Sequence, residues 1–354
     1  MTDEGRLLIA FALGLGATAL ATPIAIAIAR RTDFFDHPVG YKQHAGATPY
    51  LGGAAVVCGL LAGSVALGGH LTELWVIVAA VVGLLAVGTL DDRVGLGIGA
   101  RLAVELGLGA LLYYAGFGWS VFGAEGADLL LTVVFVIGVI NAYNLMDNLD
   151  GATPIVAGVS AIAIGLYATV EGDPLFGALG LALAGACAGF LPYNLATPRA
   201  RIFLGDGGSM PIGATVAALI MGGLPGAGAF GWESIAVTVV LVGLPALDTG
   251  LVIFSRLRRG AGVLSGGRDH LTHRLLETLG SCRRVGIVLA CGQAIFSALA
   301  IALLHIGSDA AAAGAGVTFL LGIGLIIAME SPRSTSSADP RRRVGAAVQD
   351  EFPV

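Results

Sequence analysis

Charged residues are scarce in this chain of 354 residues: Asp, Glu, Lys and Arg together make up 12% of it, whereas 56% is hydrophobic. Soluble globular proteins carry about 25% charged residues, so the composition argues against a soluble enzyme. The formal net charge is −5 and no basic segment stands apart, which argues against a nucleic-acid partner. So high an apolar content also excludes a chain that is disordered throughout.

Cysteine is scarce as well, and its spacing excludes two further classes. The four cysteines show no CxxC motif or paired spacing, which argues against a disulfide framework and a zinc site. The basic start of a cleavable signal peptide is also missing, because residues 1–6 read MTDEGR. The apolar run that follows, 7–29, is longer than the core of a signal peptide, so we expect it to be the first membrane span.

Long apolar runs are what the sequence has in abundance. A membrane-spanning helix needs roughly 20 apolar residues, and the chain offers eleven such runs, at 7–29, 50–69, 74–90, 102–117, 129–146, 154–170, 175–196, 209–225, 232–254, 285–305 and 310–329. The sequence therefore predicts an all-α, polytopic membrane protein with about eleven transmembrane helices.

The basic residues predict how these helices are oriented. Every Lys and Arg except Arg6 falls in a connection that follows an odd-numbered run, or in the tail after residue 330. Because cytoplasmic loops are enriched in Lys and Arg, the N-terminus is expected outside and the C-terminus in the cytoplasm. Residues 331–354 combine Ser, Pro and charge with few large apolar groups, and are expected to form a disordered cytoplasmic tail.

Carboxylates collect on the predicted cytoplasmic side. A charged side chain at membrane depth costs roughly 2.5–3.5 kcal/mol, so a shared function is indicated, most simply the binding of a divalent cation. Oxygen ligands without cysteine favour Mg²⁺ or Mn²⁺ over zinc. The carboxylates concerned are Asp91 and Asp92 in GTLDDRVGL, Asp147 and Asp150 in NAYNLMDNLDG, Asp206 in IFLGDGGS, Asp248 and Asp269.

Local geometry constrains these clusters. On a helix Asp150 would point opposite to Asn141, so a site that uses both requires the helix to unwind before Asp150. The segment around Gly205 is expected to be a cradle of backbone N–H groups for phosphate at a helix N-terminus. Glu105, four residues after Arg101, is expected to pair with it. For Asp248, capping and catalysis stay open.

Histidine and arginine gather in the predicted cytoplasmic loops. His270 and His273 lie in GGRDHLTHRLL (266–276), and Lys42 and His44 lie in the first loop. Such clusters can contact anionic lipid. Next to a carboxylate cluster we favour phosphate binding, because imidazole and guanidinium groups are suitable donors to phosphate oxygens.

The motifs DDRVGL, NAYNLMDNLDG, IFLGDGGS and DHLTHRL, in this order, resemble the polyprenyl-phosphate N-acetylhexosamine-1-phosphate transferase family, and PALDTGLVIFSR (245–256) also fits. The resemblance runs from Lys42 to Arg274. It implies transfer of an N-acetylhexosamine 1-phosphate, N-acetylglucosamine 1-phosphate in our interpretation, from a UDP-sugar to undecaprenyl or another polyprenyl phosphate, with release of UMP. It also implies Mg²⁺ (with Mn²⁺ as a substitute), a multi-pass protein of the inner (cytoplasmic) membrane and the first membrane step of a cell-envelope glycan.

The resemblance also implies roles for individual residues. Thr272 and Asn148 depart from the family pattern, since they stand where the family usually has His and Gly, and the role of Asn194 is left in doubt. The implied sets are Asp91, Asp92 and His270 for catalysis; Asn144 and Asp206 for magnesium; Asp147, Asp150, Phe203 and Gly205 for the nucleotide, with Phe203 stacked on uracil; and Lys42, His44, His273 and Arg274 for phosphate and sugar.

Residues 1–330 are thus predicted to form one transmembrane catalytic domain with its active site at the cytoplasmic face. Within the family, phospho-N-acetylmuramoyl-pentapeptide transferase is the alternative, and a homodimer is left open. A CDP-alcohol phosphotransferase is disfavoured because its D-G-x₂-A-R signature does not follow Asp150. A secondary transporter is disfavoured because no internal repeat is visible, and a non-catalytic scaffold because it has no use for carboxylates on one side.

Overall fold

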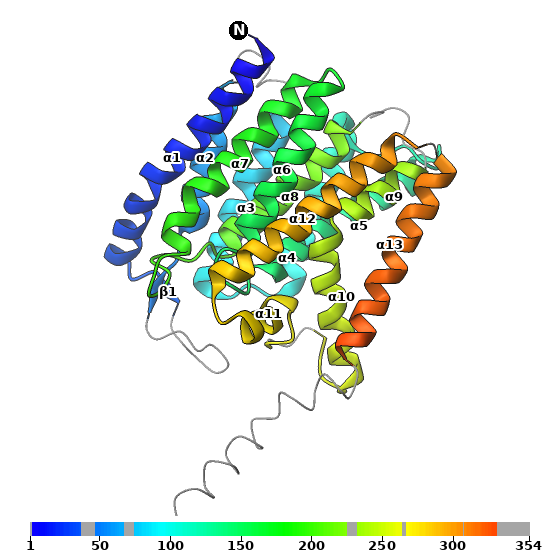
Figure 1. Cartoon of the computed structure of the whole chain (residues 1–354). Coiled ribbons are helices and arrows are strands. Elements are labelled where there is room, and N and C mark those ends of the chain that lie inside the picture. The colour runs from blue at the N-terminus through cyan, green and yellow to red at the C-terminus, as the bar shows by residue number, and fades with distance from the viewer. Residues whose placement is uncertain are drawn as a thin grey trace, which may run out of the picture.

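The computed structural model describes residues 2–36, 47–66, 74–224, 232–263, 267–306 and 308–330. The chain folds into a bundle of helices, shown in Figure 1, with one short two-stranded sheet. The elements are α1 (Asp3–Arg31), β1 (Phe35–Asp36), β2 (Thr48–Pro49), α2 (Gly52–Ser64), α3 (Trp75–Val94), α4 (Ile98–Leu112), the π-helical turn η2 (Tyr113–Phe117), α5 (Glu125–Met146), α6 (Ala152–Val170), α7 (Pro174–Asn194), α8 (Asp206–Gly223), α9 (Trp232–Leu241), α10 (Gly243–Arg258), α11 (Leu271–Leu279), α12 (Cys282–Leu304) and α13 (Ser308–Met329).

The all-α prediction is confirmed, and every predicted apolar run overlaps a helix. Within the described residues, eight helices are long and apolar enough to cross a membrane, which makes the chain a multi-pass membrane protein. The apolar helix α2 has 13 residues, fewer than a membrane-spanning helix usually needs. The count of eleven and the orientation of the termini stay predictions.

The ninth predicted run is not one helix. It divides at Val242 into α9 and α10, and Pro245 explains the break. Proline has no N–H group, so it cannot donate to the carbonyl four residues before it, that of Leu241. That carbonyl accepts a hydrogen bond from the side chain of Gln293 on α12, 2.8 Å away. The break is therefore stabilised by a neighbouring helix.

Helix α8 is the centre of the bundle. Nearly all of its residues are buried, and it packs against α2, α3, α5 and α6. Small residues allow close helix packing elsewhere too: a side chain on Gly185 of α7 would lie 2.1 Å from the carbonyl oxygen of Phe11 on α1. Helix α8 begins at Asp206, and its N-terminus lies at one end of the bundle.

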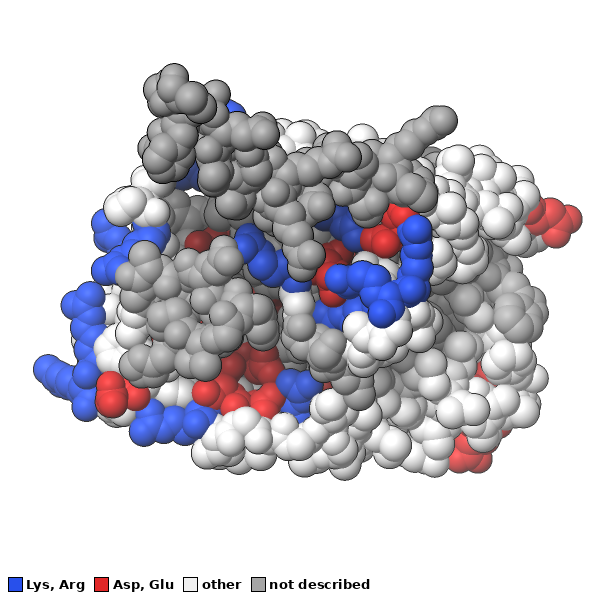
Figure 2. All heavy atoms as spheres, turned by 90° about the horizontal axis from the view of Figure 1, so that it is seen from below, with Lys and Arg blue, Asp and Glu red and all other residues white. Residues whose placement is uncertain are grey.

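Charged side chains collect at that same end. In Figure 1 it carries the β1–β2 sheet, in which Phe35 pairs with Pro49, and the short helix α11. Figure 2 views the molecule from this end and shows Lys, Arg, Asp and Glu side chains close together on it. The predicted functional residues that the structure describes belong to elements that end or begin here.

Candidate active site

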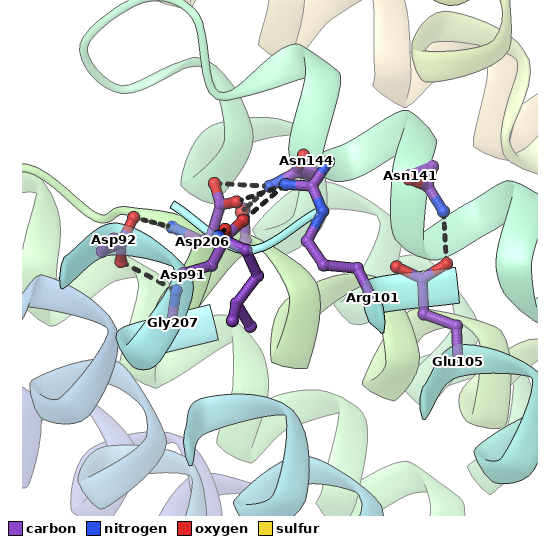
Figure 3. A network of polar contacts seen from close by, with 10 residues as sticks. Asp91, Asp92, Arg101, Glu105, Asn141, Asn144, Asp206 and Gly207 are labelled. Atoms are coloured by element: carbon purple, nitrogen blue, oxygen red, sulfur yellow. Dashed lines mark hydrogen bonds and ion pairs between the residues drawn. The ribbon is translucent and has the colours of Figure 1, made fainter. Parts of the chain in front are cut away.

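Side chains from four helices meet at the N-terminus of α8 (Figure 3). Arg101 of α4 bridges two carboxylates: its Nη1 lies 2.6 Å from Oδ2 of Asp91 and 2.8 Å from Oδ2 of Asp206. Asn144 of α5 donates from Nδ2 to Oδ1 of Asp206 at 2.8 Å and to Oγ of Ser209 at 3.0 Å. Residues from three separate sequence motifs are thus in direct contact. We call Asp91, Arg101, Asn144 and Asp206 the acidic centre.

The adjacent carboxylates of α3 have different surroundings. Asp91 points into the acidic centre, where it also accepts the Leu96 N–H, and its side chain is 8% exposed. Asp92 points to α8 and accepts the N–H groups of Asp206 and Gly207, at 3.0 and 3.1 Å. Neighbouring side chains on a helix diverge by about 100°, so the structure separates the pair. Neither carboxylate is a merely solvated surface group.

The capping by Asp92 corrects one sequence prediction. The predicted phosphate cradle is wrong in that the first N–H groups of α8 bind a carboxylate of the chain itself. Gly205 permits this contact: its φ is +72°, and a side chain there would lie 2.5 Å from Oδ2 of Asp92. The negative side chain also complements the positive end of the helix dipole. A role of Gly205 toward a nucleotide stays a prediction.

The predicted pair of Arg101 and Glu105 is also wrong. Glu105 accepts a hydrogen bond from Nδ2 of Asn141 at 2.5 Å, whereas Arg101 pairs with Asp91 and Asp206. Sequence reasoning therefore missed Arg101 as a site residue. The sequence did contain a signal for this role. Arg101 is expected at the same membrane face as many carboxylates, and these are stronger partners than the carboxylate four residues away.

The loop after α5 confirms the predicted unwinding, since the helix ends at Met146, before Asp150. Burial, together with the charges of Asp206 and Asp92, raises the pKa of Asp147 well above its usual range. The neighbouring carboxylates thus disfavour the ionised form of Asp147, and a bound cation would favour it.

Asn194 has a structural role in this loop. Its side chain is 4% exposed, accepts the Gly151 N–H at 2.6 Å and donates to the Ile202 carbonyl at 3.0 Å. It therefore ties the segment before α6 to the segment before α8. Phe203 belongs to the latter and its ring lies 6.2 Å from that of Tyr50. The nucleotide roles of Phe203 and Asp150 stay predictions.

The predicted His-rich loop begins α11. His270 is the N-cap residue and its Nδ1 lies 2.8 Å from Oδ2 of Asp248. The His273 ring lies 6.1 Å from that of His270, and its Nδ1 is buried without a hydrogen-bond partner in the described part of the chain. Burial, together with the positive charge of Arg268, lowers the pKa of His273 to about 4. His273 is thus a neutral imidazole at neutral pH.

The structure says less about the remaining residues that were predicted to bind phosphate. Arg274 pairs with the Glu330 carboxylate and donates to the Met329 carbonyl at 3.0 Å, which ties α11 to the end of α13. Its role toward phosphate stays a prediction. Lys42 and His44 lie outside the described residues.

The donor set of the acidic centre suits magnesium chemically. Among the residues that the structure describes, no three His, Cys, Asp or Glu side chains are grouped closely enough to hold a metal as they stand. The carboxylates of Asp91 and Asp206 do share one positive partner, the guanidinium group of Arg101. Asn144 adds an amide oxygen next to them. Carboxylate and amide oxygens are the ligands of a hard divalent cation.

Comparison with known proteins identifies the family. Residues 74–223 match the model of glycosyl transferase family 4. A decaprenyl-phosphate N-acetylglucosaminephosphotransferase of Mycobacterium leprae is 32% identical over 311 residues, which cover 77% of each chain. The protein of that name from Mycolicibacterium smegmatis is 32% identical over 351 residues, covering 87% of this chain and 85% of its own. The chain belongs to glycosyl transferase family 4.

A more distant relative agrees with the family assignment. The undecaprenyl-phosphate alpha-N-acetylglucosaminyl 1-phosphate transferase of Escherichia coli K12 is 25% identical over 289 residues, or 77% of each chain. The resemblance seen in the motifs is thus confirmed, and the chain is a sugar-phosphate transferase. The family match spans α3 to α8, the segment that supplies the whole acidic centre.

Two of the departures from the family pattern, Thr272 and Asn148, touch each other in this transferase. Thr272, which is fully buried, donates its hydroxyl to Oδ1 of Asn148. The contact joins α11 to the loop after α5, so each residue compensates for the other. We expect Thr272→Val and Asn148→Ala each to lower the free energy of unfolding by about 1 kcal/mol. The double variant is expected to lose much less than the sum, as measured by thermal melting in a double-mutant cycle. Additive losses would contradict the pairing.

Proposed function

We propose that this transferase moves N-acetylglucosamine 1-phosphate from UDP-N-acetylglucosamine to a polyprenyl phosphate and releases UMP, as the first membrane step of a cell-envelope glycan. The observation that carries the proposal is the meeting of Asp91, Asn144 and Asp206 at one end of a membrane-spanning bundle. The names of the relatives support the sugar and the lipid.

An apolar cavity of about 480 Å³ supports a lipid acceptor. It lies between α5, α9 and α10, and its lining residues include Phe135, Ala142, Val239 and Ile253. Ala142 is two residues before Asn144 on α5, so one end of the cavity lies at the same level along this helix as the acidic centre, on another side of it. An isoprenoid chain in this cavity would place its phosphate near Asp91, since the lipid headgroup lies at the membrane surface.

Both proposed substrates are anionic, so the site has to neutralise charge before they can meet. Asn144 and Asp206 would hold Mg²⁺, which when bound would polarise the diphosphate oxygens of the donor. Arg101 supplies a fixed positive group in the acidic centre. His270, His273, Arg274, Lys42 and His44 are the proposed donors to the remaining phosphate oxygens, and Asp147, Asp150, Phe203 and Gly205 the proposed nucleotide contacts.

The acceptor does not require a strong base. A phosphate monoester has a second pKa of about 6, so most of it is already deprotonated at neutral pH. We infer that Asp91 orients the acceptor phosphate together with Arg101, to which it is paired at 2.6 Å. Asp92 acts on the same centre by holding the backbone of Asp206 in place.

We propose eleven membrane crossings for the single domain of residues 1–330, with α9 and α10 together forming the ninth. The N-terminus would lie outside, and the active site and C-terminus would face the cytoplasm across the inner membrane. The placement of charge supports this orientation: Arg6 is near the start of α1, whereas Arg256, Arg258 and Arg274 belong to the end of the bundle with the acidic centre.

The decisive assay uses the purified protein with UDP-N-acetylglucosamine and undecaprenyl phosphate. We expect UMP to be formed only when both substrates are present, because the sugar leaves with its phosphate. A panel of UDP-sugars in the same assay would rank the donors, with UDP-N-acetylmuramoyl-pentapeptide included as the family alternative. Release of UDP in place of UMP would show sugar transfer without phosphate and would refute the proposal.

A further inference from the structure

Asp248 is a fully buried carboxylate inside helix α10, with an exposed fraction of 0%. Both of its oxygens are used. Oδ2 lies 2.8 Å from Nδ1 of His270, and Oδ1 accepts the backbone N–H of Leu271 at 2.6 Å. It joins α10 to the start of α11, 23 residues further along the chain. One side chain therefore fixes both the backbone and the imidazole ring at the N-terminus of α11.

The cost of this arrangement points to a function beyond capping. A carboxylate at membrane depth is expensive, and the N-terminus of α11 could be capped by a neutral Ser or Asn at little loss. Oδ1 alone satisfies the Leu271 N–H. The second oxygen serves only the ring of His270, which is itself 4% exposed.

We propose that Asp248 is a positioning residue that holds His270 with its proton on Nδ1 and directs Nε2 to the phosphates of the substrates. The inference rests on the proposed function for the identity of those phosphates. A carboxylate only accepts hydrogen bonds, so Nδ1 must be the donor and Nε2 is left as the atom that can meet a ligand. Nε2 has no hydrogen-bond partner in the described structure.

The variant Asp248→Asn tests the proposal because it reverses the proton on the ring. The Leu271 N–H needs an acceptor, so the amide oxygen of the new Asn must face it, as Oδ1 does now. The amide NH₂ then faces Nδ1 of His270, and two donors cannot share that contact. Nδ1 becomes the acceptor and the proton moves to Nε2. The backbone cap of α11 is preserved, so a change in kcat in this variant reports the altered ring and not the loss of the cap.

The first readout does not depend on any enzymatic activity. The ¹⁵N spectrum of the full chain labelled on histidine, recorded under alkaline conditions where imidazoles are neutral, should show the Nδ1–H form for His270 in the natural protein. The Asp248→Asn variant should show the Nε2–H form. The variant His270→Gln removes the signal and so assigns it. An unchanged form of His270 in Asp248→Asn would overturn the proposal.

The second readout is kinetic. We expect Asp248→Asn to lower kcat by about 100-fold, with KM for both substrates changed by less than about threefold. Because Asp248 acts through His270, the double variant Asp248→Asn/His270→Gln should be no slower than His270→Gln alone. Multiplicative losses in the double variant would show that Asp248 acts independently of His270, which would overturn the proposal.

A matched control is available at the start of α5, far along that helix from the acidic centre. Asp128 is 2% exposed and its two oxygens accept the N–H groups of Val121, Phe122 and Ala124. Asp128→Asn also removes a buried capping carboxylate, but it touches no histidine. We expect it to lower the melting temperature and leave kcat unchanged.

If the protein forms no UMP at all, the proposed function fails, while the tautomer measurement still decides the role of Asp248.

Discussion

Asp206→Ala is expected to lower kcat for UMP formation by about 1000-fold or more, an effect equal to removal of divalent metal by a chelator. Asp206 contacts both Asn144 and Arg101, so its loss removes the carboxylate at the centre of the proposed magnesium site. A bound cation supplies several kcal/mol of charge stabilisation in phosphoryl transfer, and each 1.36 kcal/mol is a factor of ten in rate.

The fold should survive this substitution. Helix α8 is capped through the backbone N–H groups of residues 206 and 207, which alanine retains. The measurement is UMP release together with thermal melting with and without Mg²⁺. The natural protein should be stabilised by the metal, whereas Asp206→Ala should not. Asp309→Ala, which removes an exposed carboxylate in the first turn of α13, serves as the control. Equal turnover in chelator-treated membranes would contradict the metal requirement.

The two adjacent carboxylates of α3 should give variants that differ in stability. We expect Asp91→Asn and Asp92→Asn each to lower kcat by at least about 100-fold, since one faces the acidic centre and the other holds Asp206. Asp92→Asn should also lower the free energy of unfolding, by about 2 kcal/mol, and Asp91→Asn by less, because an amide at position 91 keeps the Leu96 N–H with its oxygen and can turn its NH₂ group to the neighbouring Asp206 carboxylate. Asp92 accepts the N–H groups of Asp206 and Gly207 with different oxygens. In asparagine an NH₂ group replaces one of these oxygens and would face an N–H donor, so one of the two hydrogen bonds is lost.

Steady-state kinetics and melting of the two variants measured side by side test this difference. If Asp91 contributes to binding of the acceptor and not to its orientation in the transition state, Asp91→Asn should raise KM for polyprenyl phosphate and leave kcat intact. Near-natural kinetics for both variants would refute the catalytic assignment of the pair. Equal melting temperatures would show that the cap on α8 contributes nothing measurable.

Local sequence pattern was sufficient to predict the long helices and to single out Asp91, Asn144 and Asp206, which meet at the N-terminus of α8. Apolar runs of spanning length predicted the long helices, because every backbone polar group in a membrane has to be satisfied within its own segment, but they did not predict the short helix α11. The sequence of NAYNLMDNLDG also predicted that α5 unwinds before Asp150, because helical spacing alone would turn its polar residues to opposite faces.

The contacts within the site depended on tertiary packing and could not be predicted in the same way. Arg101 has a carboxylate four residues away, yet it pairs with Asp206, 105 residues distant in the chain. Asp92 caps α8 because the ends of α3 and α8 lie side by side in the bundle, and no local rule places them there. The division of the ninth run was locally encoded by Pro245, but its partner Gln293 was not.

The capping of α8 by Asp92 bears on how the protein matures during synthesis. The two groups are 114 residues apart in the chain, so α3 enters the membrane while α8 has yet to be translated. Until α8 arrives, Asp92 lacks both N–H groups that it accepts, and Arg101 has only one of the two carboxylates that it bridges. The acidic centre therefore assembles late, after the intervening helices have packed. An unfinished or misinserted chain cannot gather these groups, and catalytic competence coincides with completion of the bundle.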